Sequence, residues 1–189
     1  VDHKLRKNST IEANLVKKKL KLFQISSNIL TIKKINKKIN LQTFARDNRY
    51  KLIINQSLTK KIDMILTAHH KDDLIENFFI RLLRGSGLKG LISLSNIKSK
   101  VKFDDKIYIL RPLIDITKKD LAYISKNTFN FNVDDPSNSD EKFLRVKVRK
   151  LISNLEKDGL TFSKFKLSLN NLSKSNYAVD YYVKKNIKP

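Results

Sequence analysis

The stretch that decides the fold is residues 67–87, TAHHKDDLIENFFIRLLRGSG. Its polar side chains gather at the junction between a predicted strand and a predicted helix. The run at 62–66 is short and rich in Ile, Met and Leu, which favours a buried strand. From Lys71 to Leu83, apolar residues recur at helical spacing. Open α/β sheets bind ligands where a strand ends and a helix begins, so this junction is the first candidate site.

The junction concentrates ionisable side chains. Asp72 and Asp73 fall in the first helical turn, where the helix dipole favours anions. Asp73 and Glu76 are three residues apart and therefore share a helix face. An aspartate at a helix start is usually only a cap, and two adjacent histidines usually belong to a hydrogen-bonded loop. The combination of His69 and His70 with these carboxylates at one strand end nevertheless favours a pocket.

The predicted helix closes in a turn rich in backbone N–H groups, formed by Arg84, Gly85, Ser86 and Gly87. A simple C-cap also explains glycine at this position.

Other segments alternate between strand and helix patterns. Helices are predicted at 9–23, opened by a capping box of Ser9 and Glu12, and then at 41–58, 117–126, 141–156 and 162–185. Strands are predicted at 25–32, 107–110 and 130–133, and a surface loop at 94–106. The alternation predicts an α/β fold with a doubly wound, mostly parallel sheet, Rossmann-like in type. We expect an α/β domain at 1–140 and a helical extension of it at 141–189, with the last helix outside the sheet.

Composition restricts the function. The 189 residues carry 40 Lys and Arg against 18 Asp and Glu, a formal charge of +22. Such charge suits nucleic acid, although a bias toward Lys, Ile and Asn also follows from an AT-rich genome. The chain has no cysteine, which excludes disulfides and thiolate metal sites within it. No apolar run approaches about 20 residues, so we expect a cytoplasmic protein that does not span a membrane.

Six segments, in order, resemble the tRNA(Ile)-lysidine synthetases of the PP-loop ATP pyrophosphatase superfamily. They are VDHKLR at 1–6, LQTFARDNRY at 41–50, the stretch at 67–87, LRPL at 110–113, DDPSN at 134–138 and RVKVR at 145–149. The resemblance implies an adenine nucleotide alpha hydrolase-like fold.

One departure from that family is plain. The superfamily carries a Ser-Gly-Gly-x-Asp-Ser loop whose backbone amides cradle phosphate, and glycine is needed for so close an approach. The four glycines here are Gly85, Gly87, Gly90 and Gly159, none of which precedes the second predicted strand. We therefore expect an N-terminally truncated domain that lacks the first strand and phosphate loop, and that is inactive by itself.

The resemblance implies a two-step reaction. ATP, with Mg²⁺, adenylates the wobble cytidine of an isoleucine tRNA, and free L-lysine then displaces AMP to give lysidine. Asp73 and Glu76 would receive the lysine amine and take its proton, while Arg46, Arg84 and Arg111 would hold phosphate charge. The resemblance implies ATP or substrate contacts for Asp2, His3, His69, His70, Asp72, Gly85, Ser86 and Gly87, and tRNA contacts for Arg145 and Arg149. It implies no structural metal site and leaves a homodimer open.

Two rival interpretations stay open. Another PP-loop enzyme acting on tRNA, such as a thiolation enzyme, would share the fold, although such enzymes usually carry cysteines. A basic RNA-binding module without catalysis would explain the charge but not the His-His-x-Asp-Asp-x-x-Glu pattern at 69–76.

Overall fold

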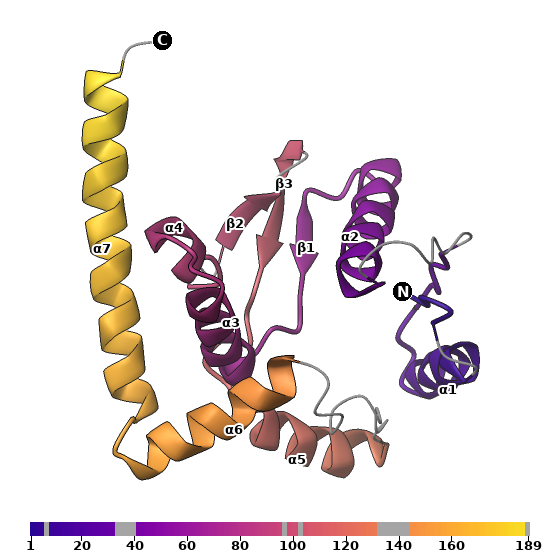
Figure 1. Ribbon diagram of the computed structural model, residues 1–189. Coiled ribbons are helices and arrows are strands. Elements are labelled where there is room, and N and C mark those ends of the chain that lie inside the picture. Colours follow the sequence, from indigo (N-terminus) through magenta and orange to yellow (C-terminus); the bar gives the residue numbers. More distant parts are fainter. Residues whose placement is uncertain (6–7, 33–40, 96–97, 102–103, 132–143, 188–189) are drawn as a thin grey trace.

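The computed structural model describes residues 1–5, 8–32, 41–95, 98–101, 104–131 and 144–187 (Figure 1). The elements in chain order are α1 Ser9–Leu22, α2 Leu41–Thr59, β1 Met64–Leu66, α3 Lys71–Leu83, α4 Leu88–Leu91, β2 Lys98–Val101, β3 Asp104–Leu110, α5 Lys118–Phe129, α6 Leu144–Lys157 and α7 Phe162–Asn186. None of these described helices is both long enough and apolar enough to cross a membrane.

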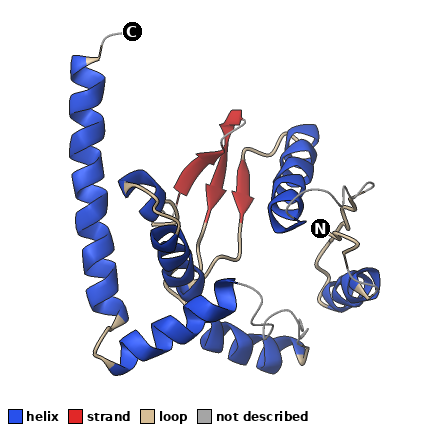
Figure 2. Ribbon diagram, viewed as in Figure 1, coloured by secondary structure: helices blue, strands red, loops and turns tan. Residues whose placement is uncertain are grey.

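A three-stranded sheet of order β1-β3-β2 lies at the centre, with helices on both sides of it (Figure 2). β1 is parallel to β3, with Met64 opposite Tyr108 and Leu66 opposite Leu110. β2 is antiparallel to β3. Because β1 and β3 are parallel neighbours, their carboxyl ends meet at one edge, from which the chain continues to the start of α3 (Figure 1).

Two apolar clusters hold the helices in place. The cluster beside the sheet joins α2 to β1 and β3 through Ile54, Ile65, Ile107 and Ile109. The cluster at α3 contains the buried residues Leu74, Ile75, Ile92, Leu94, Ile114, Phe165 and Leu169. Among the side chains that the structure describes, this cluster joins α3 to α7 and to Ile92, Leu94 and Ile114.

Phe165 of α7 is the aromatic centre of the α3 cluster. Its ring centroid lies 5.2 Å from that of Phe78 at an interplanar angle of 85°, and 6.5 Å from that of Phe79 in a stacked arrangement. Edge-to-face pairs at this spacing are favourable beyond the area they bury. These contacts place α7 outside α3 and the sheet, as predicted (Figure 1).

The predicted helices are confirmed, with shifts of a few residues at some ends and a short α4 that was not expected. The predicted start of α6, at 141–143, lies outside the described residues. The expected loop at 94–106 is wrong in its described part, which holds β2 and the first half of β3. Its polar residues concealed the hairpin, because an antiparallel edge strand does not need an apolar pattern.

The predicted strand at 25–32 is also wrong. Only one parallel bridge, between Asp2 and Thr31, forms there, supported by hydrogen bonds from Asp2 N to Leu30 O at 2.7 Å and from Ile32 N to Asp2 O at 3.1 Å. Asn130 ends α5 in a left-handed conformation, with φ of 44°, where the sequence predicted the start of a strand. The remainder of that predicted strand, at 132–133, and the 134–138 segment lie outside the described residues.

The predicted capping box at Ser9 does not form. α1 begins at Ser9 itself, and its N-cap, Asn8, makes no side-chain cap hydrogen bond. The hydroxyl of Thr10 instead donates to a carboxylate oxygen of Asp2 at 2.6 Å. Asp2 therefore ties the start of α1 to the bridge at Thr31.

Candidate functional site

The chain that leaves β1 is anchored to the end of β3. Thr67 donates its backbone N–H to Leu110 O at 2.9 Å and its hydroxyl to the same oxygen at 3.3 Å. The Thr67 hydroxyl also lies 2.8 Å from Nδ1 of His69, within hydrogen-bond distance. His69 is thus held at the carboxyl edge of the parallel strand pair, where the sequence placed the candidate site.

His69 lies among arginines. Burial lowers its pKa most, Asp73 acts in the opposite direction, and the positive charges of Arg111, Arg46 and Arg145 lower the pKa further. His69 is therefore neutral near pH 7 and can exchange hydrogen bonds without adding charge. Its arginine neighbours come from α2, from the end of β3 and from α6, so three separate segments direct positive charge at this edge.

Arg111 is the most enclosed of these arginines. It follows β3 directly and is buried, with 6% of its surface exposed. Burial is the main cause that lowers its pKa, and a guanidinium remains charged even so. A buried cation at a strand end is suited to an anionic ligand, which can offset its desolvation.

α3 begins in a capping box made by two of the predicted site residues. His70 Nδ1 accepts from the Asp73 N–H at 3.4 Å, and Asp73 Oδ2 accepts from the His70 N–H at 3.2 Å. His70 Nε2 also lies 3.4 Å from Asp73 Oδ2. One oxygen of Asp73 is therefore committed to the helix start.

Asp72 connects α3 to α5. Its Oδ2 accepts from the backbone N–H of Lys118 at 2.8 Å, and the N–H of Lys71 donates to Ile116 O at 2.9 Å. Asp72 therefore has a structural partner at the start of α5 in addition to any role in binding.

Arg145 and Arg149 of α6 pair with the carboxylates of α3. Arg145 donates through Nε to Glu76 Oε2 and through an Nη atom to Asp73 Oδ1, the latter at 2.7 Å. Arg149 donates through Nε to Glu76 Oε1 at 2.5 Å. The Glu76 side chain is only 5% exposed, whereas those of Arg145 and Arg149 are 48% and 34% exposed. We call these four side chains the ionic cluster.

The ionic cluster joins two groups that the sequence assigned to separate partners. The carboxylates were predicted to receive an amine, and the arginines were predicted to contact tRNA. The sequence did contain a signal for this pairing. Two arginines four residues apart share one face of their helix, and two carboxylates three residues apart share one face of theirs. Sequence reasoning did not use it, since the packing of α6 on α3 is a tertiary contact.

Asp2 and His3 lie among α1, α2 and the bridge. Asp2 is buried, and its carboxylate accepts from Thr10 and from Lys4 N, hydrogen bonds that lower its pKa, with Thr10 the larger cause. His3 Nε2 accepts from Arg49 Nε of α2 at 3.1 Å, and burial lowers the pKa of His3. Neither side chain joins the ionic cluster in the described contacts.

The turn at 84–87 lies at the opposite end of α3. Gly85 has φ of +68°, and the amides of Arg84, Gly85 and Ser86 donate to Arg81 O or Leu82 O. Thirteen residues at about 1.5 Å each place this turn roughly 15–20 Å from Asp73. The structure therefore does not bring the turn together with the acidic pair.

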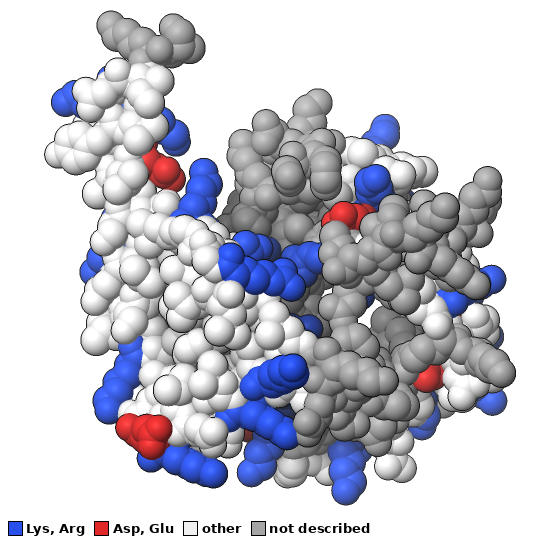
Figure 3. Space-filling model, in the orientation of Figure 1, with Lys and Arg blue, Asp and Glu red and all other residues white. Residues whose placement is uncertain are grey.

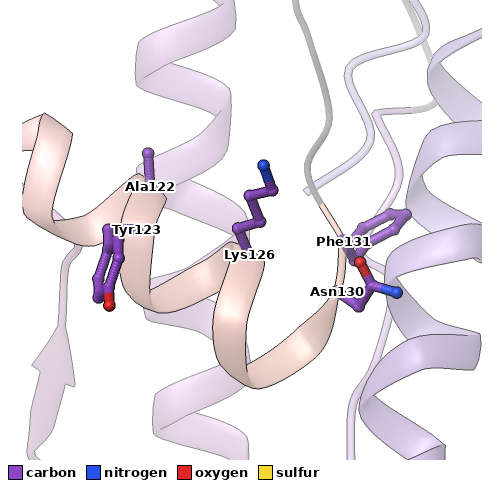
Figure 4. Close-up of a pocket in the computed structure, with 5 residues that line it drawn as sticks. All are labelled: Ala122, Tyr123, Lys126, Asn130 and Phe131. Carbon is purple, nitrogen blue, oxygen red and sulfur yellow. The ribbon is translucent and has the colours of Figure 1, made fainter.

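Surface features add little chemistry. Lysines and arginines far outnumber acidic residues on the face seen in Figure 3. A shallow hollow of about 390 Å³ on α5 is lined by Ala122, Tyr123, Lys126, Asn130 and Phe131, none of them a predicted site residue (Figure 4). Within the described ranges, no group of three or more metal-ligating side chains forms a cluster.

Fold and site together define an open α/β protein whose cationic edge lies at the carboxyl ends of parallel strands. The model of the PP-loop domain matches residues 1–156. The chain therefore belongs to the PP-loop family, as the sequence resemblance predicted.

Curated relatives carry the name tRNA(Ile)-lysidine synthase. The protein of Orientia tsutsugamushi (strain Boryong) is 40% identical over 158 residues, which cover 82% of this chain and 34% of that protein. The protein of Rickettsia rickettsii (strain Sheila Smith) is 36% identical, covering 81% and 31%, and that of Bradyrhizobium diazoefficiens is 33% identical, covering 84% and 43%. The chain thus spans about a third of the length of the first two relatives.

A solved structure with a similar fold is the U34-tRNA thiolase NcsA from Methanococcus maripaludis with its [4Fe-4S] cluster. Its TM-score is 0.68 at 18% identity, covering 88% of this chain and 56% of the other. At 18% identity this match supports a conclusion about the fold alone. It confirms the predicted fold class, an α/β domain of adenine nucleotide alpha hydrolase type with a helical extension.

Proposed function

We propose that this chain is part of a tRNA(Ile)-lysidine synthetase, a ligase that uses ATP to join L-lysine to the wobble cytidine of an isoleucine tRNA. The names of the relatives and the PP-loop family support this proposal. Because the chain spans only part of each relative, the activity is proposed for the whole protein.

One observation carries the proposal: three arginines lie within electrostatic reach of His69, and one of them, Arg145, also pairs with the carboxylates of Asp73 and Glu76. The reaction handles phosphate anions and an amine cation together, and it needs groups of both signs close to one another. Arg46, Arg111 and Arg145 are near enough to lower the pKa of His69, and Asp73 is near enough to raise it. Few simpler functions explain why positive and negative side chains lie together at the carboxyl ends of β1 and β3.

The proposed roles follow from this geometry. Arg111 and Arg46 bind phosphate oxygens and stabilise negative charge as AMP leaves. His69, neutral and oriented by Thr67, hydrogen-bonds nucleotide or substrate. Asp73 and Glu76 receive the lysine ammonium and take the proton that it must lose before attack. The turn at Arg84, Asp2 and its neighbour His3 make no described contact with the ionic cluster and are proposed only as outer contacts.

ATP fits the cationic edge because arginines there suit phosphate chemistry. When bound, ATP would supply the activated leaving group on the tRNA base. Magnesium fits less directly, since the described residues offer no acidic cluster for it and Arg145 and Arg149 engage Glu76. We therefore propose that any Mg²⁺ is held chiefly by phosphate oxygens and water, a common arrangement for this ion.

We also propose that Arg145 and Arg149 contact tRNA and that the protein acts in the cytoplasm, and we leave a homodimer open. The helical extension belongs with the α/β domain, because Phe165 and Leu169 of α7 are part of the α3 cluster. Thiolation is the weaker alternative, since these 189 residues contain no cysteine to transfer sulfur or hold an iron–sulfur cluster.

The proposal is tested with the intact protein, ATP, labelled L-lysine and an isoleucine tRNA transcript with a wobble cytidine. Mass spectrometry of the digested tRNA should show a nucleoside heavier by one lysine less one water. A tRNA in which the wobble cytidine is replaced by uridine is the matched control and should not gain this mass. No change in either tRNA, or the same mass gain in the uridine control, would contradict the proposal.

A further inference from the structure

The carboxylates proposed to receive lysine are already occupied by the protein itself. Glu76 accepts from Arg145 on one oxygen and from Arg149 on the other, and Asp73 accepts from Arg145 on Oδ1. The second oxygen of Asp73 accepts from His70 N in the capping box. All four carboxylate oxygens therefore already accept from the protein, so an incoming ammonium would have to share them with these donors.

The cluster is also balanced in charge, with two cations facing two anions. A third cation would meet the guanidinium groups of Arg145 and Arg149 at the same carboxylates. Removing both arginines without replacement would leave Glu76, whose side chain is 5% exposed, as an unpaired buried charge, which is costly. The lysine ammonium must therefore replace an arginine at these carboxylates.

The arginines are the accessible half of the cluster. Their side chains are 48% and 34% exposed, against 18% for Asp73 and 5% for Glu76. α6 carries five basic residues and one acidic residue, so its surface attracts a polyanion. A guanidinium group can bind phosphate with two parallel hydrogen bonds, just as it can bind carboxylate. RNA phosphate is therefore a direct competitor of the carboxylates for these two arginines.

From these contacts we infer that tRNA opens the lysine pocket by drawing Arg145 and Arg149 from the carboxylates to its phosphates. The inference rests on the proposed function and adds its regulation. Lysine then binds well only after tRNA, and the amine is kept away from the site while no acceptor base is present. Because binding couplings are reciprocal, lysine must tighten tRNA binding by the same factor.

The experiment measures the Kd of L-lysine for the intact protein by equilibrium dialysis, with and without a saturating isoleucine tRNA transcript. No ATP is added, so no lysine is consumed. We expect lysine to bind about 5- to 150-fold more tightly with tRNA, the usual range of coupling between sites. The reciprocal measurement, the Kd of tRNA with and without lysine, should give the same factor.

Three variants locate the effect. Arg149→Gln frees one oxygen of Glu76 while Arg145 still neutralises it, so lysine should bind this variant more tightly without tRNA and tRNA should add less. Arg149→Lys keeps a cation in place and should retain most of the tRNA effect. Lys147→Gln removes one exposed positive charge from the same helix and should behave as wild type. Circular dichroism checks that each variant is folded.

Equal lysine affinity with and without tRNA in the wild-type protein would overturn the inference, whatever the variants show. So would an Arg149→Gln protein that is folded and binds lysine no better than Lys147→Gln. Failure of the proposed function is distinct, because it appears as absence of the lysine-bearing nucleoside in wild-type tRNA. If that nucleoside forms while the Kd of lysine is the same with and without tRNA, the inference is wrong and the proposed function stands.

Discussion

Helix α3 has two flanks that are held by opposite means. On the apolar flank, Phe78 and Phe79 pack against Phe165 of α7. On the polar flank, Asp73 and Glu76 pair with arginines of α6. Apolar packing stabilises regardless of what is bound, whereas a buried ion pair adds little net stability but can exchange partners. Apolar contacts, which include Ile152 of α6 as well as Phe165 of α7, therefore keep α3 in place, while the Arg145 and Arg149 side chains can exchange partners.

The largest effect should come from the apolar flank. Phe165→Ala should lower the free energy of unfolding by about 3–5 kcal/mol, because it leaves a cavity among three aromatic rings. Leu167→Ala on the same helix is the control, since Leu167 is 62% exposed and should change stability by less than about 0.5 kcal/mol. Urea denaturation measures both. A loss below about 1 kcal/mol for Phe165→Ala would mean that α7 does not anchor α3.

On the polar flank, Glu76→Gln should raise the lysine concentration required for transfer by about 10- to 150-fold, since a hydrogen bond to a charged group contributes about 1.5–3 kcal/mol. ATP–pyrophosphate exchange should change much less. Steady-state kinetics of the intact protein measure both steps, with exposed Glu156→Gln on α6 as the control. An unchanged apparent affinity for lysine would remove Glu76 from the amine site.

A smaller effect is expected from the arginines of α6. Arg145→Ala combined with Arg149→Ala should reduce the salt slope of tRNA binding by about 2 units at most, roughly one per phosphate contact. Binding of ATP should be nearly intact, and circular dichroism checks that the variant is folded, because it leaves buried Glu76 without these two partners. The measurement is tRNA affinity across a salt series, with Lys51→Ala on α2 combined with Lys60→Ala directly after that helix as the charge-matched control. Identical slopes for both double variants would show that the α6 arginines have no special contact with tRNA.

The smallest effect concerns pH. The pKa of His69 is lowered in the folded protein. Below about pH 6.5 the unfolded chain therefore binds a proton at His69 more readily than the folded chain does. Stability should therefore fall slightly as the pH drops from 7 to 5, and His69→Gln should reduce that fall. Denaturant midpoints across this range measure it. His3 has a pKa lowered in the same direction, so His3→Gln serves as the comparison. A steeper fall in His69→Gln would contradict the assignment.

Local patterns predicted α3 and the placement of Asp73 and Glu76 on it, because helical periodicity and the start of a helix are encoded nearby in the chain. The hairpin of β2 and β3 was missed, since its polar residues resemble a loop. The segment at 25–32 has strand-like residues but only one bridge to Asp2. Such pairings depend on neighbours far away in sequence, which no local pattern reveals.

The candidate site shows the same division. The resemblance selected residues of the right chemistry, and the structure brings His69, Arg111, Arg46 and Arg145 within electrostatic reach of one another. It could not indicate that Arg145 and Arg149 contact Glu76, because only the packing of α6 on α3 creates that pair. The roles assigned to these residues stay predictions until the variants are measured.

The position of β1 at the border of the sheet has a practical consequence. Among the described residues β1 pairs only with β3, and its residues Met64 and Leu66 are 44% and 66% exposed. A bare strand border with apolar side chains invites pairing with other molecules. Purified residues 1–189 should therefore aggregate increasingly with concentration, visible as rising light scattering. Replacing Leu66 by lysine should keep the preparation clear at higher concentration.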